Sequence, residues 1–260
     1  KYNLKDESDF LLGKAKITHV WTQSKAESEK ISKATHIKNI CDNYEDMIGE
    51  VDAVIIARDD YKLHCEMAKP FLEAGLSVFV DKPLSVNKDE LKYFLPYLKT
   101  NKLMSCAGVR YAKELDYIRA NIKDFKNMKL IRGTVLNSWE KYGIHMLDGI
   151  FNIIDFNVKS VVAINGKHMS VILKNYDESI IQIDALDTTV KTFQFDFWAE
   201  NQKFTAEVDD NFTAFKRTLY YFIQMIETGK SDIEANLTIN LMKVLMAARI
   251  SENENREVSL

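Results

Sequence analysis

Short apolar runs rich in β-branched residues alternate with helix-forming segments through the first hundred residues, and this alternation constrains the fold most. Val51–Ala57 (VDAVIIA) is the clearest run. Because it is almost wholly apolar, it predicts a strand that is buried on both faces. Lys16–Trp21 and Ser77–Val80 predict two further strands. Strands separated by helices are typical of βαβ units, so this half predicts a parallel sheet.

The remaining predicted elements of this half continue the alternation of strands and helices. Two more strands are expected at Ile37–Cys41 and Met104–Ala107, and helices at Ser24–Lys33, near Tyr44–Ile48, at Tyr61–Ala74 and at Asn87–Thr100. Gly75 stands where the third helix needs a left-handed cap.

The second half changes pattern near Gly108. A helix at Ala112–Ile122 and a helical segment at Gly143–Asp155 accompany strands at Leu130–Asn137, Val158–Asn165, Met169–Lys174, Ile180–Ala185 and Val190–Ala199. Short polar turns between such strands predict a mainly antiparallel sheet. Apolar residues at helical spacing in 212–226 and 237–248 predict two amphipathic helices that cover it. We therefore expect an α/β protein with a first domain over residues 1–107 and a second, α+β domain over 108–260.

Composition excludes several classes of protein. The chain of 260 residues is 46% apolar, with nine Gly and three Pro, which fits a folded core and not a disordered chain. Its 35 basic and 38 acidic residues are interspersed, so a nucleic-acid surface is not expected. No apolar run approaches the roughly 18 residues that span a bilayer. Cys41, Cys65 and Cys106 show no paired spacing and lie among apolar residues, which predicts buried thiols and a cytoplasmic protein.

Two clusters of residues could carry chemistry. Asp81-Lys82-Pro83 follows a predicted parallel strand, at the sheet edge where α/β proteins bind ligands. A lysine there can stabilise a substrate alkoxide, and a Lys-Pro bond adopts the cis form more readily than other peptide bonds. A solvated lysine in a chance tripeptide is the alternative.

The second cluster surrounds His145. On a helix from about Tyr142, Asp148 would share a face with His145 and could orient its imidazole as a general base, with Lys141 one turn before. A partly buried structural histidine is the alternative. His64 follows the Val51–Ala57 strand and is expected to be structural. His19, His36 and His168 have no partners at metal-ligand spacing, so no metal site is expected.

These segments resemble the glucose-fructose oxidoreductase and inositol dehydrogenase family (Gfo/Idh/MocA). The resemblance is carried by VDAVIIA at 51–57, His64, Ala74-Gly75, VFVDKPL at 78–84 and Tyr142-Gly143-Ile144-His145, and it extends to the closing residues 256–260. It implies a Rossmann domain followed by an open-sheet domain. It also implies an NAD(P)-dependent oxidoreductase that acts on a CH-OH group of a sugar, polyol or related molecule. Lys82 would be the catalytic lysine and His145 the histidine that contacts the substrate hydroxyl.

The resemblance also suggests binding residues. Lys141 and Tyr142 are expected to contact the substrate. Cofactor contacts are expected from Thr22, Gln23, Ser24, Ala57, Arg58, Asp59, His64, Asp81 and Lys82. We also expect a homo-oligomer.

Three departures from the family pattern matter. Lys141 stands where the family often has an Asp four residues before the histidine, and Glu140 or Asp148 could take its place. Thr22-Gln23-Ser24-Lys25 replaces the acidic residue that binds the ribose of NAD, which favours NADP. No G-x-G occurs in the chain, so we expect that the first strand and its Gly-rich turn precede Lys1.

The alternative function is a ligand- or cofactor-sensing regulatory protein on the same fold.

Overall fold

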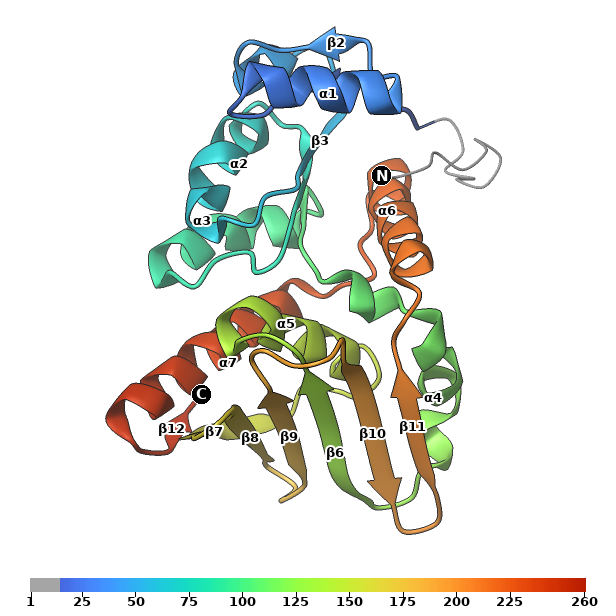
Figure 1. Cartoon of the computed structure of the whole chain (residues 1–260), viewed down its shortest axis with the longest axis vertical. Coiled ribbons are helices and arrows are strands. Elements are labelled where there is room, and N and C mark those ends of the chain that lie inside the picture. Colours follow the sequence, from blue (N-terminus) through green and yellow to red (C-terminus); the bar gives the residue numbers. More distant parts are fainter. Residues whose placement is uncertain (1–14) are drawn as a thin grey trace.

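The five strands predicted in the first half all form, but they lie in two separate sheets (Figure 1). The structure, a computed structural model, describes residues 15–260. β1 (His19–Val20) pairs in parallel with β2 (Asn39–Ile40). β3 (Ala53–Ile56), β4 (Ser77–Val80) and β5 (Leu103–Met104) form a second parallel sheet in that order. Among residues 15–260, no strand joins β1 to β3.

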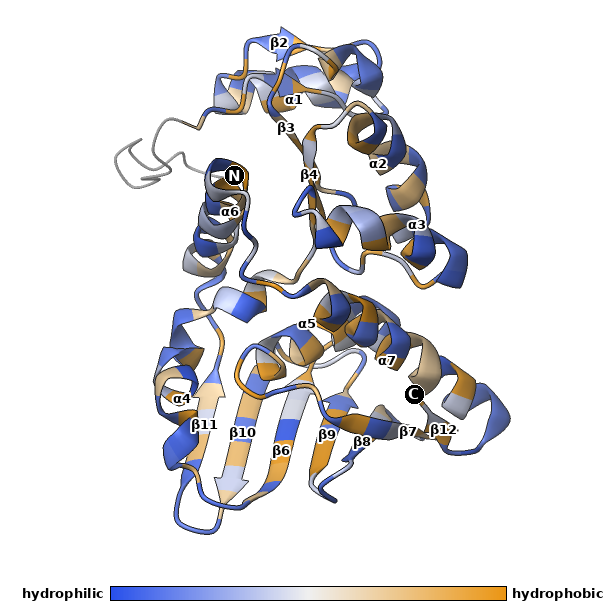
Figure 2. Cartoon of the chain, turned by 180° about the vertical axis from the view of Figure 1, so that it is seen from behind, coloured by the Kyte–Doolittle hydropathy of each residue, from blue (hydrophilic) through white to orange (hydrophobic). Residues whose placement is uncertain are grey.

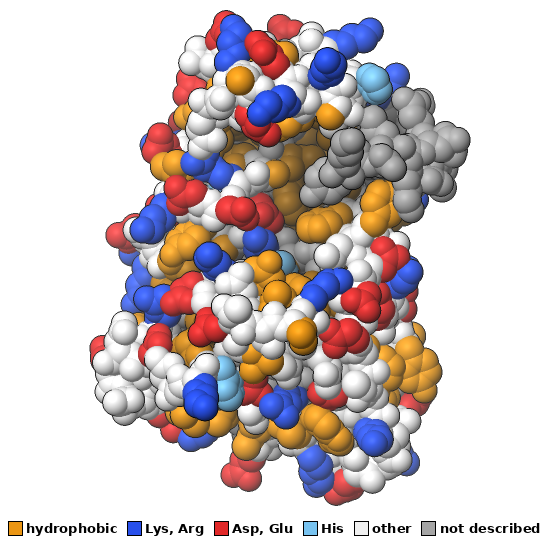
Figure 3. Space-filling view, viewed as in Figure 1, with side chains coloured by type: hydrophobic (Ala, Val, Ile, Leu, Met, Phe, Trp, Pro, Cys, Tyr) orange, Lys and Arg blue, Asp and Glu red, His pale blue; other side chains and the backbone are white. Residues whose placement is uncertain are grey.

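The open edge of β3 corrects one prediction. Val54 and Ile56 are buried, but Ile55 is 39% exposed, so β3 is not buried on both faces. The apolar pattern is that of a central strand, whereas among the described residues β3 has a neighbouring strand on one side only. A hollow with hydrophobic side chains lies over this part of the molecule (Figure 3).

The helices of the first half agree with prediction to within a few residues. They are α1 (Lys25–Thr35), α2 (His64–Glu73) and α3 (Lys88–Lys99), and the segment at Tyr44–Met47 is a short 3-10 helix. Asn87 caps α3 by accepting the backbone N–H groups of Asp89 and Glu90. Gly75 adopts φ 82°, the left-handed conformation expected after α2.

The second half is built on a seven-stranded sheet of order β11-β10-β6-β9-β8-β7-β12 (Figure 1). Its strands are β6 (Met128–Val135), β7 (Val158–Asn165), β8 (Met169–Asn175), β9 (Ile180–Ala185), β10 (Phe193–Ala199), β11 (Lys203–Glu207) and β12 (Val258–Ser259). All neighbours are antiparallel except β6 and β9. The predicted α/β class with a mainly antiparallel second sheet is confirmed. The edge strands β11 and β12 are not among the predicted strands.

Two helices pack on the large sheet, and one predicted to do so does not. α5 (Trp139–Ile150) contacts β6, β9 and β10, and α7 (Ala235–Glu254) contacts β7, with hydrophobic residues throughout these elements (Figure 2). α6 (Asn211–Thr228) instead buries Phe222 and Met225 against Phe79 and Met104 of the small sheet. The prediction that α6 covers the antiparallel sheet is wrong, because its apolar face is occupied by the small sheet.

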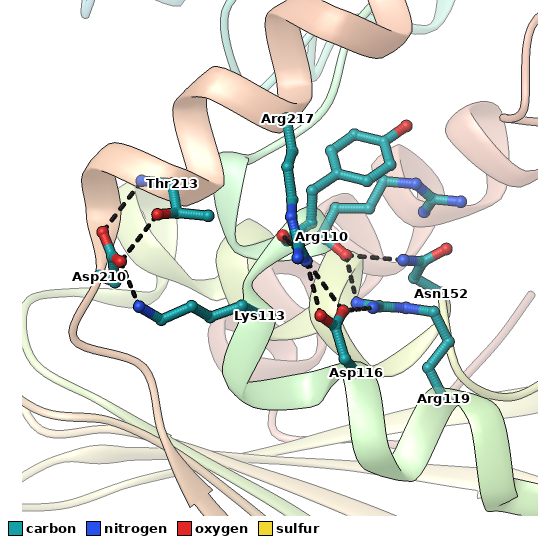
Figure 4. A network of polar contacts seen from close by, with 9 residues as sticks. Arg110, Lys113, Asp116, Arg119, Asn152, Asp210, Thr213 and Arg217 are labelled. Carbon is teal, nitrogen blue, oxygen red and sulfur yellow. Dashed lines mark hydrogen bonds and ion pairs between the residues drawn. The ribbon is translucent and has the colours of Figure 1, made fainter. Parts of the chain in front are cut away.

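A buried crossover joins the two halves. Every residue from 103 to 112 is buried. On one side, Arg119 and Asn152 donate hydrogen bonds to the carbonyl oxygen of Arg110, at 2.9 and 2.6 Å (Figure 4). Asp116, at the start of α4 (Asp116–Asn121), accepts from Arg217 of α6 at 2.8 Å. These polar contacts fix the backbone between the two sheets.

Candidate active site

Lys82 stands at the carboxyl end of β4, as predicted. Its side chain is 18% exposed, and its Nζ lies 3.5 Å from a carboxylate oxygen of Asp81 and 3.9 Å from one of Asp59. The Lys82-Pro83 peptide bond is cis. The ammonium group is thus held among two carboxylates at the ligand-binding edge of a parallel sheet.

His145 lies within α5, in an aromatic setting. Its ring centroid is 4.9 Å from that of Tyr142 and 5.6 Å from that of Phe193. Nδ1 is buried and has no hydrogen-bond partner among residues 15–260. Burial and, to a lesser extent, the charge of Lys82 lower the pKa of His145 to about 3. The imidazole is therefore neutral near pH 7 and can accept a proton.

Lys82 and His145 belong to different halves of the chain but to one region of the molecule. A narrow crevice between the halves is lined by Lys82, Leu84, Ser105, Cys106, Ile144, Asp148, Thr238, Leu241 and Met242. It joins the carboxyl ends of β4 and β5 to α5 and α7. A charged group and a neutral proton acceptor on facing elements are the pair that proton transfer with alkoxide stabilisation needs.

Asp148 does not orient His145. Its Oδ2 accepts the backbone N–H of Ala107 at 2.7 Å, and its Oδ1 lies 3.5 Å from Nη1 of Arg110. The hypothesis of a direct carboxylate–imidazole bond is therefore wrong. Burial raises the pKa of Asp148 to about 6, although Arg110 and the Ala107 N–H act in the opposite direction.

The two predicted substrate residues flank His145 differently. Lys141 is exposed, four residues before His145 on the same helix face, and has no ion pair among the described residues. Tyr142 is partly buried against His145 and Phe193. Glu140, considered as a substitute carboxylate, pairs with Arg249 of α7 and is thereby engaged away from the imidazole.

The turn after β3 offers an unsatisfied donor. Arg58 is 18% exposed in its side chain, and its Nε is buried without a hydrogen-bond partner, while Nη2 lies 3.9 Å from Asp60. Ala57 and Asp59 are exposed beside it. An orphaned guanidinium nitrogen at this sheet edge suits an acceptor group on a ligand.

His64 has a structural position. It is fully buried, and its two ring nitrogens lie 2.9 Å from the carbonyl oxygens of Pro83 and Arg58. The expected contact of His64 with a cofactor does not fit this burial. The ring instead links the turn that carries Lys82 to the turn that carries Arg58.

The residues after β1 are partly engaged with their own loop. The Thr22 hydroxyl donates to the Ser24 carbonyl at 2.8 Å, and Gln23 is exposed. Lys25 pairs with Asp42, which follows β2, at 3.0 Å. The cation expected to favour a 2′-phosphate therefore already has a carboxylate partner.

Some site residues carry no signal in the sequence. Phe193 begins β10, some fifty positions after His145, and Thr238 reaches the crevice from α7. Nothing in their local sequence distinguishes them from core residues.

Residues 15–260 contain no group of His, Cys, Asp and Glu that could hold a metal ion, and no helix among them is long and apolar enough to cross a membrane. Cys106 is buried, but Cys41 and Cys65 are only partly so, and all three are free thiols.

One known family matches the first part of the chain. Residues 3–108 match the sequence model of GFO_IDH_MocA, described as an oxidoreductase family with an NAD-binding Rossmann fold. This first part of the chain is therefore similar to the Gfo/Idh/MocA family. A search of curated protein sequences found no match.

Solved structures extend the likeness to the whole chain at the level of fold. Myo-inositol 2-dehydrogenase from Lactobacillus plantarum superposes with a TM-score of 0.86 at 17% identity, over 97% of this chain and 95% of that one. A putative myo-inositol dehydrogenase from Sinorhizobium meliloti gives 0.83 at 17%, over 97% and 94%. Scyllo-inositol dehydrogenase from Lactobacillus casei, solved with NAD(H) and scyllo-inositol, gives 0.81 at 14%, over 99% and 97%.

Proposed function

We propose that this chain is an NAD(P)-dependent oxidoreductase that moves a hydride between the nicotinamide and a hydroxyl-bearing carbon of a sugar, polyol or related molecule. One observation carries the proposal: the neutral imidazole of His145, with an unpartnered Nδ1, is close enough to Lys82 to be influenced by its charge, and it follows Ile144, which lines the same crevice as Lys82. The family of residues 3–108 and the inositol dehydrogenase neighbours agree with this chemistry.

In the proposed reaction, His145 acts as the base and Lys82 supplies the positive charge. A bound nicotinamide cofactor supplies the hydride acceptor. A ring nitrogen of His145 takes the proton of the substrate hydroxyl; burial lowers the pKa of His145 and so keeps this nitrogen unprotonated at neutral pH. The Lys82 ammonium stabilises the alkoxide that forms. Tyr142, which contacts the His145 ring, and the exposed Lys141 on the same helix are proposed to contact the substrate.

The residues at the sheet edge fit the nicotinamide half of a cofactor. Arg58 offers a buried donor, and Lys82, Asp81, Ala57 and Asp59 follow the ends of β3 and β4. No G-x-G occurs in the sequence, so we assign the pyrophosphate to no residue of this chain. We keep NADP as the proposed preference, with Thr22, Gln23 and Ser24 near the adenosine end.

The remaining proposals concern context. Three free thiols support a reducing compartment, and we propose a cytoplasmic location. We also propose a small-molecule substrate and a homo-oligomeric assembly.

A sensor is the second candidate, favoured by Lys141 in place of the family Asp. A sensor would bind NAD(P) or a polyol without turnover. Purified protein is therefore incubated with NAD or NADP and a panel of inositols, sugars and sugar acids, and NAD(P)H formation is followed by absorbance. Turnover supports the enzyme. Calorimetric binding of cofactor or polyol without turnover would favour the sensor.

A further inference from the structure

Asp148 is a buried ionisable group of α5 that the proposed reaction leaves unused. It lies one turn after His145, is 3% exposed, and its carboxylate has its partners outside α5. Oδ2 accepts the N–H of Ala107 at 2.7 Å, and Oδ1 lies 3.5 Å from Nη1 of Arg110, itself 3% exposed. A buried carboxylate costs free energy unless its partners are well placed, so this position is unusual for a merely structural residue.

Both partners belong to the crossover, residues 103–112. This segment leaves the small sheet at the end of β5, next to β4, whose carboxyl end carries Lys82. A bond from α5 to the crossover therefore connects the helix of His145 to the sheet of Lys82 by a short path.

α5 is tightly packed at this point. A Cβ at Gly149, the residue after Asp148, would lie 2.6 Å from the ring of Phe195 and 3.3 Å from Val109 of the crossover. The helix thus touches the crossover directly. On the opposite side, Arg119 and Asn152 hold the Arg110 carbonyl, while the Arg110 guanidinium extends away from them (Figure 4). The crossover backbone is therefore held in place, and the hydrogen bond that Asp148 accepts from it fixes the position of α5.

We propose that Asp148 is a positioning residue, which fixes α5 against the crossover and thereby holds His145 opposite Lys82. Its consequence for catalysis rests on the proposed function, but the placement is a property of the folded chain. Without the carboxylate, the Ala107 N–H and the Arg110 guanidinium lose their buried acceptor, so α5 shifts relative to the crossover. The imidazole then gains contact with water and lies farther from Lys82.

The test is the titration of His145 by NMR in protein with labelled histidine, with His145→Gln used to assign the signal. In the wild type the imidazole stays neutral down to pH 5. In Asp148→Ala its proton affinity rises by at least about tenfold, a change of about one in pKa. Asp148→Asn, which keeps an acceptor for Ala107, gives a smaller rise. Asp196→Asn is the matched control, because Asp196 is also a buried carboxylate but accepts hydrogen bonds from Gln194 and Thr205, outside α5 and the crossover, and it leaves His145 unchanged.

An unchanged His145 titration in folded Asp148→Ala overturns the proposal. If circular dichroism shows that this variant does not fold, the Asn variant decides in the same way. In the turnover assay, both Asp148 variants lower kcat by about tenfold or more with little change in KM, as for a residue that acts on geometry. Absence of turnover in the wild type would contradict the proposed function, and it is read separately from the titration.

Discussion

At the scale of residues, the site depends on what surrounds each polar group more than on which groups are present. His145 is neutral because Tyr142 and Phe193 help to desolvate it and Lys82 is near. A histidine of the same sequence context on an exposed helix would titrate near 6.5. The sequence indicated the lysine and the histidine, but burial by a strand fifty positions away supplies the property that matters.

The lowered pKa of His145 predicts an acid sensitivity. The unfolded chain binds a proton at this histidine below pH 6.5, whereas the folded chain does so only near pH 3, so stability rises with pH across this window. From pH 7.5 to 5 the wild type should lose about 1–2 kcal/mol more unfolding free energy than His145→Gln, with allowance for partial exposure. Urea denaturation at both pH values measures this. Parallel losses in the two proteins would contradict it.

The Lys25–Asp42 pair predicts how cofactor preference can be changed. Asp42→Asn frees the Lys25 ammonium for a 2′-phosphate, so the NADP to NAD affinity ratio should increase several-fold, and Lys25→Ala should decrease it. Calorimetric titration with both cofactors measures the ratio. Glu27→Gln, which breaks the exposed Lys30–Glu27 pair on the same helix, is the control. No change of the ratio in either Lys25 or Asp42 variants would remove these residues from cofactor selection.

At the scale of elements, local pattern specified most strands and helices, and neighbours decided the rest. β4, β7 and β9 have the predicted bounds because their apolar runs end at clear turn residues. β11 alternates exposed and partly buried residues, so its sequence carries little hydrophobic signal, and only pairing with β10 defines it. The position of α6 could not be predicted, since an apolar helix face does not state which of two sheets it covers.

The separated sheets predict the effect of an added strand. An extension ahead of Lys1 with an apolar strand and a Gly-rich turn should pair with β1 and β3 and cover Ile55. Burying one such side chain contributes roughly 1.5–3 kcal/mol, so we expect a melting temperature higher by several degrees and tighter NAD(P) binding. The same extension with aspartates in place of the apolar strand residues is the control. Equal melting temperatures and equal cofactor affinities with and without the extension would contradict the prediction.

At the scale of the whole molecule, the account depends on two halves meeting along one crevice. The crossover connects the small sheet to the second half along the chain. α6 connects them as well: its Arg217 pairs with Asp116 of α4, and its Phe222 packs against Phe79 of β4. This arrangement brings the charge of Lys82 close enough to act on His145, although 63 positions separate them. From the sequence we predicted that the two residues would face one cleft and act on a single substrate hydroxyl. Their joint action on that hydroxyl stays a prediction.

A double-mutant cycle on Lys82 and His145 tests that central claim most directly. Turnover of an inositol or other polyol with NAD or NADP is compared in the wild type, Lys82→Ala, His145→Ala and the double variant, with cofactor affinity measured in parallel. We expect each single substitution to lower kcat by roughly 10² to 10⁴ with little change in cofactor affinity. We expect the double variant to be little worse than either single one, because groups that act as a unit are not additive. Wild-type turnover in either single variant, or a double loss equal to the product of the single losses, would contradict the account.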